Sequence, residues 1–285
     1  MPELNRVTVV GAGTMGSQIA LQTALSGRYA VTLVDTVAGQ LERARAQNRK
    51  LTDRSVEKQR LTRDHADAAL ARIQDSNDLP KSVADADLVI EAVIENFDAK
   101  RRVFEDLGKH ANSNAILASN SSTIVISRLA GVSGRPERCC NMHFFHPVTV
   151  MQLCEVVRGP MTSDETAATA VEFVRSIDRT PVLLQKEIWG FIVNRVLFAA
   201  AEEAMRLLEG GYASADDIDT AVQKGLNWPM GPFHLLDFSG LDVFYGAMQD
   251  RHQLGEGPEA PRVLGKLVED GRLGRKTGKG FFDYE

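Results

Sequence analysis

A histidine and a glutamate, His143 and Glu155, stand at equal distances along the chain from Thr149. His143 lies in a short apolar run, and Glu155 lies in a second run, 151–157, whose alternate residues share one face as in a strand. Pro147 bars one straight strand through the whole segment. If the two runs return antiparallel about Thr149, the two side chains face each other with Cβ atoms about 5 Å apart. A carboxylate would then fix the tautomer of the imidazole, which suits it to moving a proton near neutral pH.

The same pair has a simpler interpretation. Two polar residues in the interior of a protein commonly satisfy each other's hydrogen bonds, because buried polar groups are rarely left unpaired. Segment 141–155 alone does not separate a catalytic pair from a structural one. The elements that would position the pair, and the other polar residues beside it, must decide between the two.

The composition is that of a globular protein. The chain has 285 residues, 44% of them hydrophobic, and this length favours two domains. A net charge of −5 without a basic stripe argues against nucleic acid or an anionic membrane as a partner. The N-terminus carries no export signal and no apolar run reaches about 18 residues, so we expect a soluble, cytoplasmic protein. The cysteines, Cys139, Cys140 and Cys154, lack disulfide or metal-ligand spacing, and we expect them to be reduced and buried.

The N-terminal segment has the pattern of a dinucleotide-binding unit. The run Arg6–Val10 predicts a strand, GAGTMG follows it, and the segment 17–25 predicts a helix. In such a turn Gly11 allows the tight bend, Gly13 lets the backbone approach a diphosphate, and Gly16 lets the helix pack on the strand. The helix N-terminus offers N–H groups to phosphate. The residues of the turn expected to contact the cofactor are Gly11, Gly13, Thr14, Met15 and Gly16.

A second predicted strand, 29–34, ends at Asp35, nineteen residues beyond Gly16. A carboxylate at this position accepts hydrogen bonds from both ribose hydroxyls of the adenosine and repels a 2′-phosphate. The sequence therefore favours NAD over NADP. The alternative for Asp35 is a solvated strand end.

Helix and strand patterns alternate through the rest of the first domain. Segment 40–73 contains neither glycine nor proline and predicts two helices, the second capped by Thr62, as an insertion that projects from the sheet. Lys58 in this insertion could meet an anionic ligand or could belong to a solvated charged face. Further strands are expected at 88–93, 115–118, 141–145 and 181–184, with a helix at 97–107.

Polar residues follow two of these strands. Glu91, Glu95 and Lys100 stand at or just past the end of 88–93, and the run SNSST at 119–123 follows 115–118. Ligands of open parallel sheets bind at the carboxyl ends of the strands, so we expect some of these side chains to face the cofactor. The hydroxyls of SNSST could also cap a helix.

The last third of the chain predicts helices. Segment 191–208 carries an apolar stripe at 193, 196, 197, 200, 201, 204, 207 and 208, and Gly210 and Gly211 end it. Further helices are expected at 214–221, 232–238, 241–248 and 261–269, with a short strand only at 281–284. We therefore expect two domains, 1–186 and 187–285. A long apolar stripe in so small a domain suggests a homodimer.

Several segments together form a pattern that covers nearly the whole chain. In chain order they are GAGTMG, Asp35, VIEAVIEN, ASNSST, MHFFHPVTVMQLCEV, GFIVNR, PMGPFHLLDFSGLD and GRKTGKGFFDY. With them the sequence resembles the L-3-hydroxyacyl-CoA dehydrogenase family, and most of all its bacterial 3-hydroxybutyryl-CoA dehydrogenases. The resemblance implies a Rossmann-like NAD-binding domain with a helical insertion, followed by an all-α dimerisation domain. It also implies the oxidation of a short-chain L-3-hydroxyacyl-CoA to the 3-ketoacyl-CoA, and the reverse.

The resemblance also implies roles for single residues. His143 is similar to the catalytic base of the family and Glu155 to its partner, while Ser122 and Asn194 are similar to the groups around the reacting oxygen. Lys58 matches a residue near the CoA phosphates. The further cofactor contacts would be Glu95, Lys100, Asn120, Ser122, His146 and Lys276.

Two positions depart from the family pattern. His146 stands where the family usually has an asparagine that contacts the cofactor, and Glu187, Ile188 and Trp189 replace Asp-Thr-Pro. Trp189 could reshape the mouth through which the acyl chain enters. Two other functions stay open: a dehydrogenase of a free hydroxy acid, and an NAD-binding protein without catalysis, as among crystallin relatives.

Overall fold

The computed structural model describes residues 4–284, which form two compact units. The units are Met1–Phe191 and Ile192–Glu285. The sequence led us to expect a division between 186 and 187, a few residues before the point where the structure divides. Each unit is described by itself below. Among residues 4–284, no helix is both long enough and apolar enough to cross a membrane.

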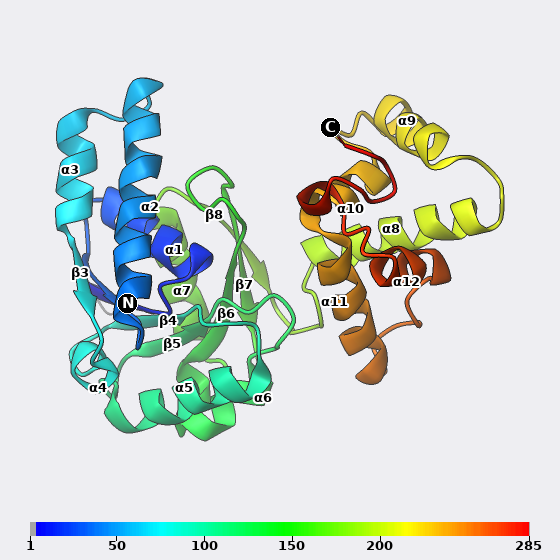
Figure 1. Ribbon diagram of the computed structural model, residues 1–285. Helices are drawn as coiled ribbons and strands as arrows, with labels where there is room; N and C mark the ends of the chain where they lie inside the picture. Colours follow the sequence, from blue (N-terminus) through cyan, green and yellow to red (C-terminus); the bar gives the residue numbers. More distant parts are fainter. Residues whose placement is uncertain (1–3, 285) are drawn as a thin grey trace. The chain divides into compact units, whose positions relative to one another are not determined.

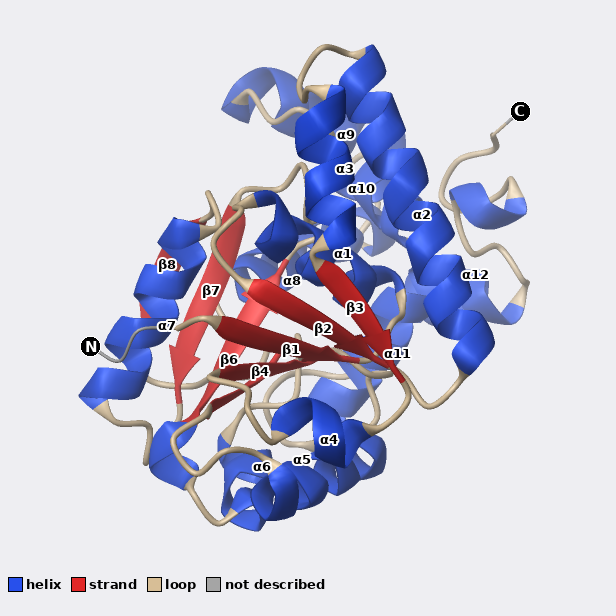
Figure 2. Ribbon diagram, turned by 90° about the vertical axis from the view of Figure 1, so that its left-hand side faces the viewer, coloured by secondary structure: helices blue, strands red, loops and turns tan. Residues whose placement is uncertain are grey.

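The described part of the N-terminal unit is a Rossmann-like sheet of eight strands with helices on both faces (Figures 1 and 2). The strand order is β3-β2-β1-β4-β5-β6-β7-β8; β6 and β7 pair antiparallel, and β8 runs parallel to β7, so these last two strands run against the other six. The strands are β1 (Arg6–Val10), β2 (Ala30–Val34), β3 (Ile73–Ser76), β4 (Leu88–Glu91), β5 (Ile116–Ser119), β6 (Cys139–Phe144), β7 (Leu153–Arg158) and β8 (Thr180–Leu184).

Two apolar layers hold the helices on the sheet. Because side chains of a strand alternate between faces, Val9 packs with α1, α3 and α7 while Val10 packs with α5 on the other face. Figure 2 shows α4, α5 and α6 together on one side of the strands. The helices of this unit are α1 (Thr14–Leu25), α2 (Ala38–Glu57), α3 (Arg63–Ala71), α4 (Leu79–Val83), α5 (Phe97–His110), α6 (Ser127–Ala130) and α7 (Asp164–Ser176).

The predicted helical insertion is the pair α2 and α3, which rises beyond the edge of the sheet in Figure 1. Thr62 caps α3 as expected, because its side chain accepts the backbone N–H of His65. The predicted helical segment ends too late, because Ile73 begins strand β3, which pairs parallel to β2. The two helices therefore also form the crossover between these paired strands.

The C-terminal unit is helical in its described part, as expected. Ser214 caps α9, since its hydroxyl accepts the N–H of Asp217. Segment 281–284 is not a strand: it takes part in an isolated β-bridge between Lys279 and Asp283, and its N–H groups at Phe281 and Phe282 donate to Asp237 of α10. The helices are α8 (Val193–Glu209), α9 (Ala215–Leu226), α10 (Pro232–Ser239), α11 (Leu241–Gln253) and α12 (Arg262–Glu269), with the 3-10 turn η3 (Arg275–Thr277).

Candidate active site

The antiparallel pairing of β6 and β7 places His143 directly opposite Glu155, which confirms the geometry expected from the sequence. His143 Nδ1 lies 2.8 Å from Glu155 Oε2, and the histidine side chain is only 8% exposed. The rings of Phe145 and Phe191 lie 4.4 and 5.6 Å from the imidazole, centroid to centroid. The imidazole is therefore held by a buried carboxylate on one side and by aromatic rings around it.

The turn after β6 is fixed by polar side chains that the sequence did not single out. Gln18 of α1 accepts the N–H of Val148 at 2.9 Å, and Arg179 donates to the Val148 carbonyl at 2.9 Å. Gln18 is buried among the apolar residues of its helix. A glutamine in such a segment indicates that its side chain has a hydrogen-bond partner, and this was the signal that the sequence offered. The bond from His146 to Pro147 is cis, and the side chain of His146 is exposed.

The glycine turn has the shape that a dinucleotide requires. Gly11 has φ +104°, and a Cβ on Gly16 would lie 1.8 Å from the carbonyl oxygen of Gly11, so neither position accepts a side chain. Above Gly13 there is open space within 4 Å, and no side chain caps the helix that begins at Thr14. The first N–H groups of α1 therefore remain for a diphosphate, and the residues present fit NAD.

Asp35 follows β2 and already makes two hydrogen bonds. One carboxylate oxygen accepts the N–H of Ala12 at 2.8 Å, and the other accepts the N–H of Val37 at 2.9 Å. Asp35 thus ties the glycine turn to the loop after β2. Each carboxylate oxygen keeps a second lone pair, so the side chain can still accept a ribose hydroxyl.

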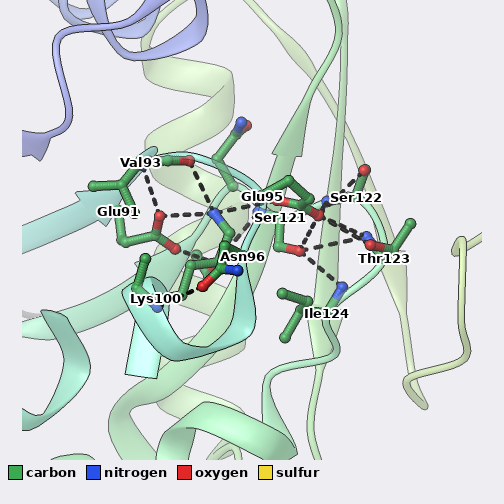
Figure 3. A network of polar contacts seen from close by, with 12 residues as sticks. Glu91, Val93, Glu95, Asn96, Lys100, Ser121, Ser122, Thr123 and Ile124 are labelled. Carbon is green, nitrogen blue, oxygen red and sulfur yellow. Dashed lines mark hydrogen bonds and ion pairs between the residues drawn. The ribbon is translucent and has the colours of Figure 1, made fainter. Parts of the chain in front are cut away.

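Glu95 collects hydrogen bonds from the loop after β5 (Figure 3). Its Oε1 accepts the N–H groups of Ser122 and Thr123 at 3.0 and 3.2 Å, together with the hydroxyl of Ser121. Burial raises the pKa of Glu95, but the ammonium of Lys100 and the Ser121 hydroxyl outweigh it, so the pKa lies below its ordinary value. The carboxylate is ionised at neutral pH and fixes the loop that holds Ser122.

The other predicted site residues lie in different surroundings. Asn120 accepts the N–H of Phe144 at 3.0 Å, so it supports the end of the strand that carries His143. Lys58 is exposed at the C-terminus of α2. Asn194 and Lys276 belong to the C-terminal unit, where the Lys276 ammonium lies 2.5 and 2.6 Å from the two oxygens of Asp242. Burial raises the pKa of Cys139 to about 11, and the three cysteines are buried thiols as expected.

Trp189, which belongs to the departure from the family pattern, is 3% exposed. The expectation that its bulk reshapes the entrance for the acyl chain stays a prediction. Glu187, the first residue of the same departure, accepts the N–H of Ser127 at 3.0 Å and so supports the start of α6. One residue of this departure from the family pattern, Glu187, therefore holds the first turn of α6 in place.

Comparison with known proteins gives one consistent result. Residues 6–188 match the family description "3-hydroxyacyl-CoA dehydrogenase, NAD binding domain", and residues 190–284 match its C-terminal domain. A curated relative from Deinococcus radiodurans, named probable 3-hydroxybutyryl-CoA dehydrogenase, is 42% identical over 97% of this chain and 99% of its own length.

Solved structures agree. The (S)-3-hydroxybutyryl-CoA dehydrogenase from Ralstonia eutropha has a TM-score of 0.95 at 36% identity, over 99% of this chain and 100% of the other. A diketoreductase described as acting on dicarbonyl compounds has a TM-score of 0.88, also at 36% identity, over 100% of both chains. Two domain matches and full-length relatives lead to one conclusion: the chain belongs to the family of NAD-dependent 3-hydroxyacyl-CoA dehydrogenases.

Proposed function

We propose that this dehydrogenase interconverts short-chain L-3-hydroxyacyl-CoA and 3-ketoacyl-CoA, with His143 and Glu155 as its proton-transfer pair. The observation that carries the proposal is the buried contact of 2.8 Å between His143 Nδ1 and Glu155 Oε2, at the carboxyl edge of a sheet whose first turn fits NAD. Related proteins named 3-hydroxybutyryl-CoA dehydrogenase support the short chain.

Proton transfer follows from the hydrogen bond. Glu155 accepts the proton of Nδ1, so the neutral imidazole carries its acceptor lone pair on Nε2. In the oxidation direction Nε2 takes the proton of the 3-hydroxyl, and Glu155 stabilises the imidazolium that forms. In the reduction direction the imidazolium returns the proton to the oxygen of the ketone. NAD supplies the hydride acceptor when it is bound.

Ser122 is the group we assign to the oxygen that changes charge. Its loop follows β5, which pairs with β6, and Glu95 accepts its backbone N–H at 3.0 Å. The Ser122 hydroxyl donates to the same carboxylate at 3.4 Å, and its proton would turn from Glu95 to the developing negative charge. Asn194, in the C-terminal unit, stays a prediction for the same oxygen, and Lys276 and His146 stay predictions for the cofactor.

One assay separates the acyl-CoA substrate from a free keto acid. NADH oxidation is followed with acetoacetyl-CoA and with free acetoacetate at matched concentrations. We expect kcat/KM to be higher for the CoA ester by at least about 100-fold, since binding energy of the remote CoA group serves the reacting centre. Equal values of kcat/KM would favour a free keto compound as the substrate. The similar diketoreductase is described as acting on dicarbonyl compounds.

Lys58 gives a second readout for CoA. Its side chain is exposed at the end of α2, and Lys50 on the same helix offers a matched control. Lys58→Ala should raise KM for acetoacetyl-CoA a few-fold, the effect of one exposed phosphate contact, and leave KM for NADH unchanged. Lys50→Ala should change neither value.

We further propose a cytoplasmic homodimer formed through the helical unit. Exposed apolar side chains of that unit support the dimer, among them Val196, which lies on the predicted stripe of α8 and is 59% exposed. Light scattering should give twice the mass of the chain, and Val196→Asp should reduce it towards the monomer. Buried, protonated thiols suit a reducing compartment. The other large apolar residues exposed in the described part of that unit are Ile192, Tyr212, Leu226, Phe238, Val243 and Leu254.

A further inference from the structure

A buried carboxylate lies beneath the proposed nicotinamide edge without reaching it. Glu91, the last residue of β4, is fully buried. The ammonium of Lys100, from α5, lies 2.7 Å from Glu91 Oε1, and the lysine side chain is 1% exposed. Figure 3 shows Lys100 between Glu91 and Glu95, whose Oε2 lies 3.2 Å from the same ammonium. Three charges thus form one chain from the interior to the surface.

The carboxyl oxygens of Glu91 accept in each of these contacts. Oε1 also accepts the N–H of Val93 at 2.8 Å, and Oε2 accepts the hydroxyl of Ser119 at 2.6 Å. Three donors, one of them the Lys100 ammonium, thus surround one carboxyl group. Burying such a charge costs free energy, and an apolar residue would often fill the same space at no loss of stability. We therefore look for a role of Glu91 other than packing.

Glu91 reaches the loop of Ser122 by two routes. Lys100 joins it to Glu95, which accepts the Ser122 N–H at 3.0 Å. Ser119, whose hydroxyl donates to Glu91, accepts the N–H of Ser121 at 3.2 Å. Both routes end on the same loop, so the place of Ser122 depends on a carboxylate that does not touch it.

The cluster also has a defined charge. Glu91 and Glu95 contribute two negative charges and Lys100 one positive charge, which leaves a net charge of −1. Without Glu91, the ammonium would cancel the charge of Glu95. The outer carboxylate is 40% exposed, so this negative charge acts at the surface where the loop of Ser122 lies. The nicotinamide ring of NAD⁺ is a cation, whereas that of NADH is neutral.

We propose that Glu91 is a positioning residue which, through Lys100 and Ser119, holds Glu95 and the Ser122 loop and keeps a net negative charge beside the nicotinamide. The consequence is a preference for the oxidised over the reduced cofactor. The inference rests on the proposed placement of the nicotinamide next to Glu95 and Ser122. Glu91 itself contacts neither cofactor nor substrate.

The test measures cofactor binding without substrate. Glu91→Gln keeps the size of the side chain and brings the net charge of the cluster to zero. Calorimetric titration with NAD⁺ and with NADH gives the two dissociation constants. We expect the Kd for NAD⁺ to rise about ten-fold more than the Kd for NADH, the effect of one unit charge at roughly 10 Å in a protein environment.

Two further variants separate charge from structure. Ser119→Ala removes a neutral hydrogen bond from the same carboxylate and keeps all three charges, so the ratio of the two Kd values should stay within about two-fold of the original. Glu91→Asp shortens the side chain and keeps all three charges, so its ratio should also stay within about two-fold of the original.

Equal weakening of NAD⁺ and NADH in Glu91→Gln, with an unchanged circular dichroism spectrum, would overturn the proposal. So would a ratio that changes about ten-fold in Glu91→Asp, which keeps the charge. If Glu91→Gln does not fold, Glu91→Asp decides by itself, because a changed ratio at constant charge contradicts the charge balance and an unchanged ratio supports it. These titrations contain no acyl-CoA, so a failed acetoacetyl-CoA assay would count against the proposed substrate and not against Glu91.

Discussion

Among residues 4–284, two histidines lie against a buried carboxylate, one in each unit. His143 Nδ1 lies 2.8 Å from Glu155, and His234 Nδ1 lies 2.6 Å from Asp219. Both carboxylates are buried. Distance and burial alone would make both pairs equal candidates for proton transfer.

Their neighbours separate them. Asp219 also accepts the N–H groups of Phe233 and His234 at 2.8 and 2.9 Å, so it joins α9 to the first turn of α10. The ring of His234 stacks on Phe282 with centroids 4.0 Å apart. The C-terminal pair therefore serves helix packing, whereas His143 lies on β6, which pairs with β5, the strand that leads into the Ser122 loop. A pair is identified as catalytic by what lies around it.

The largest expected effect comes from replacing each histidine in turn. His143→Gln should lower turnover by about 10²–10⁴, the range for a positioned proton-transfer group, with the Kd for NAD⁺ nearly unchanged. His234→Gln, the matched change, should keep turnover within about two-fold. Steady-state kinetics with acetoacetyl-CoA and NADH give both values. Near-normal turnover in His143→Gln would remove its assignment as the base.

Replacing the two carboxylates should change different properties, turnover for Glu155 and stability for Asp219. Glu155→Gln should lower turnover, by about 10²–10⁴ as for its partner, because the imidazolium loses its counter-charge. Asp219→Asn should instead lower the free energy of unfolding by about 1–3 kcal/mol, since its backbone donors lose part of their acceptor. Turnover and urea unfolding are measured on both variants. A loss of turnover in folded Asp219→Asn would show that the C-terminal pair acts in the reaction.

Asp35 resembles Asp219 in holding backbone N–H groups, yet we expect its replacement to change cofactor choice. Asp35→Ala should weaken NADH binding about ten-fold and reduce the discrimination against NADPH, because a ribose acceptor and a repulsive charge disappear together. Fluorescence titration with both cofactors measures this. If the unaltered protein binds NADH and NADPH equally, Asp35 does not select the cofactor.

The smallest effect concerns Tyr284, whose pKa is raised to about 12 by burial and by its hydrogen bond to Asp237. An unfolded tyrosine has a pKa of about 10. The stability that this bond contributes is therefore complete below pH 10 and is lost as the pH rises through about 12. Tyr284→Phe should show a shallower alkaline decline in urea unfolding than the control Tyr212→Phe, whose ring is exposed. Parallel declines would contradict this.

The sequence was sufficient where a local pattern has one structural solution. The alternation in β7 and the turn around Thr149 determined that His143 faces Glu155. Glycines with no room for a Cβ determined the cofactor turn. Strand β3 was missed because IQDS has one apolar residue, and only its pairing with β2 makes it a strand.

Other features depend on contacts that no local pattern contains. In α8 the buried residues include Phe198 and Met205, outside the predicted stripe, while Val196 within that stripe is exposed. The order of charges in Glu91, Lys100 and Glu95 likewise follows from how β4 and α5 pack. Residue types predicted that polar groups would gather at this edge, and the fold decided which of them are buried.

The stability of the helical unit depends on the segment from Phe281 to Tyr284. Asp237 on α10 is buried, and its donors are the N–H groups of Phe281 and Phe282 and the hydroxyl of Tyr284. A chain clipped before this segment would leave a buried charge without partners, at a cost of about 3–5 kcal/mol. A truncated chain would therefore unfold more often and be cleaved faster by proteases. A fusion at this end of the chain must keep these residues.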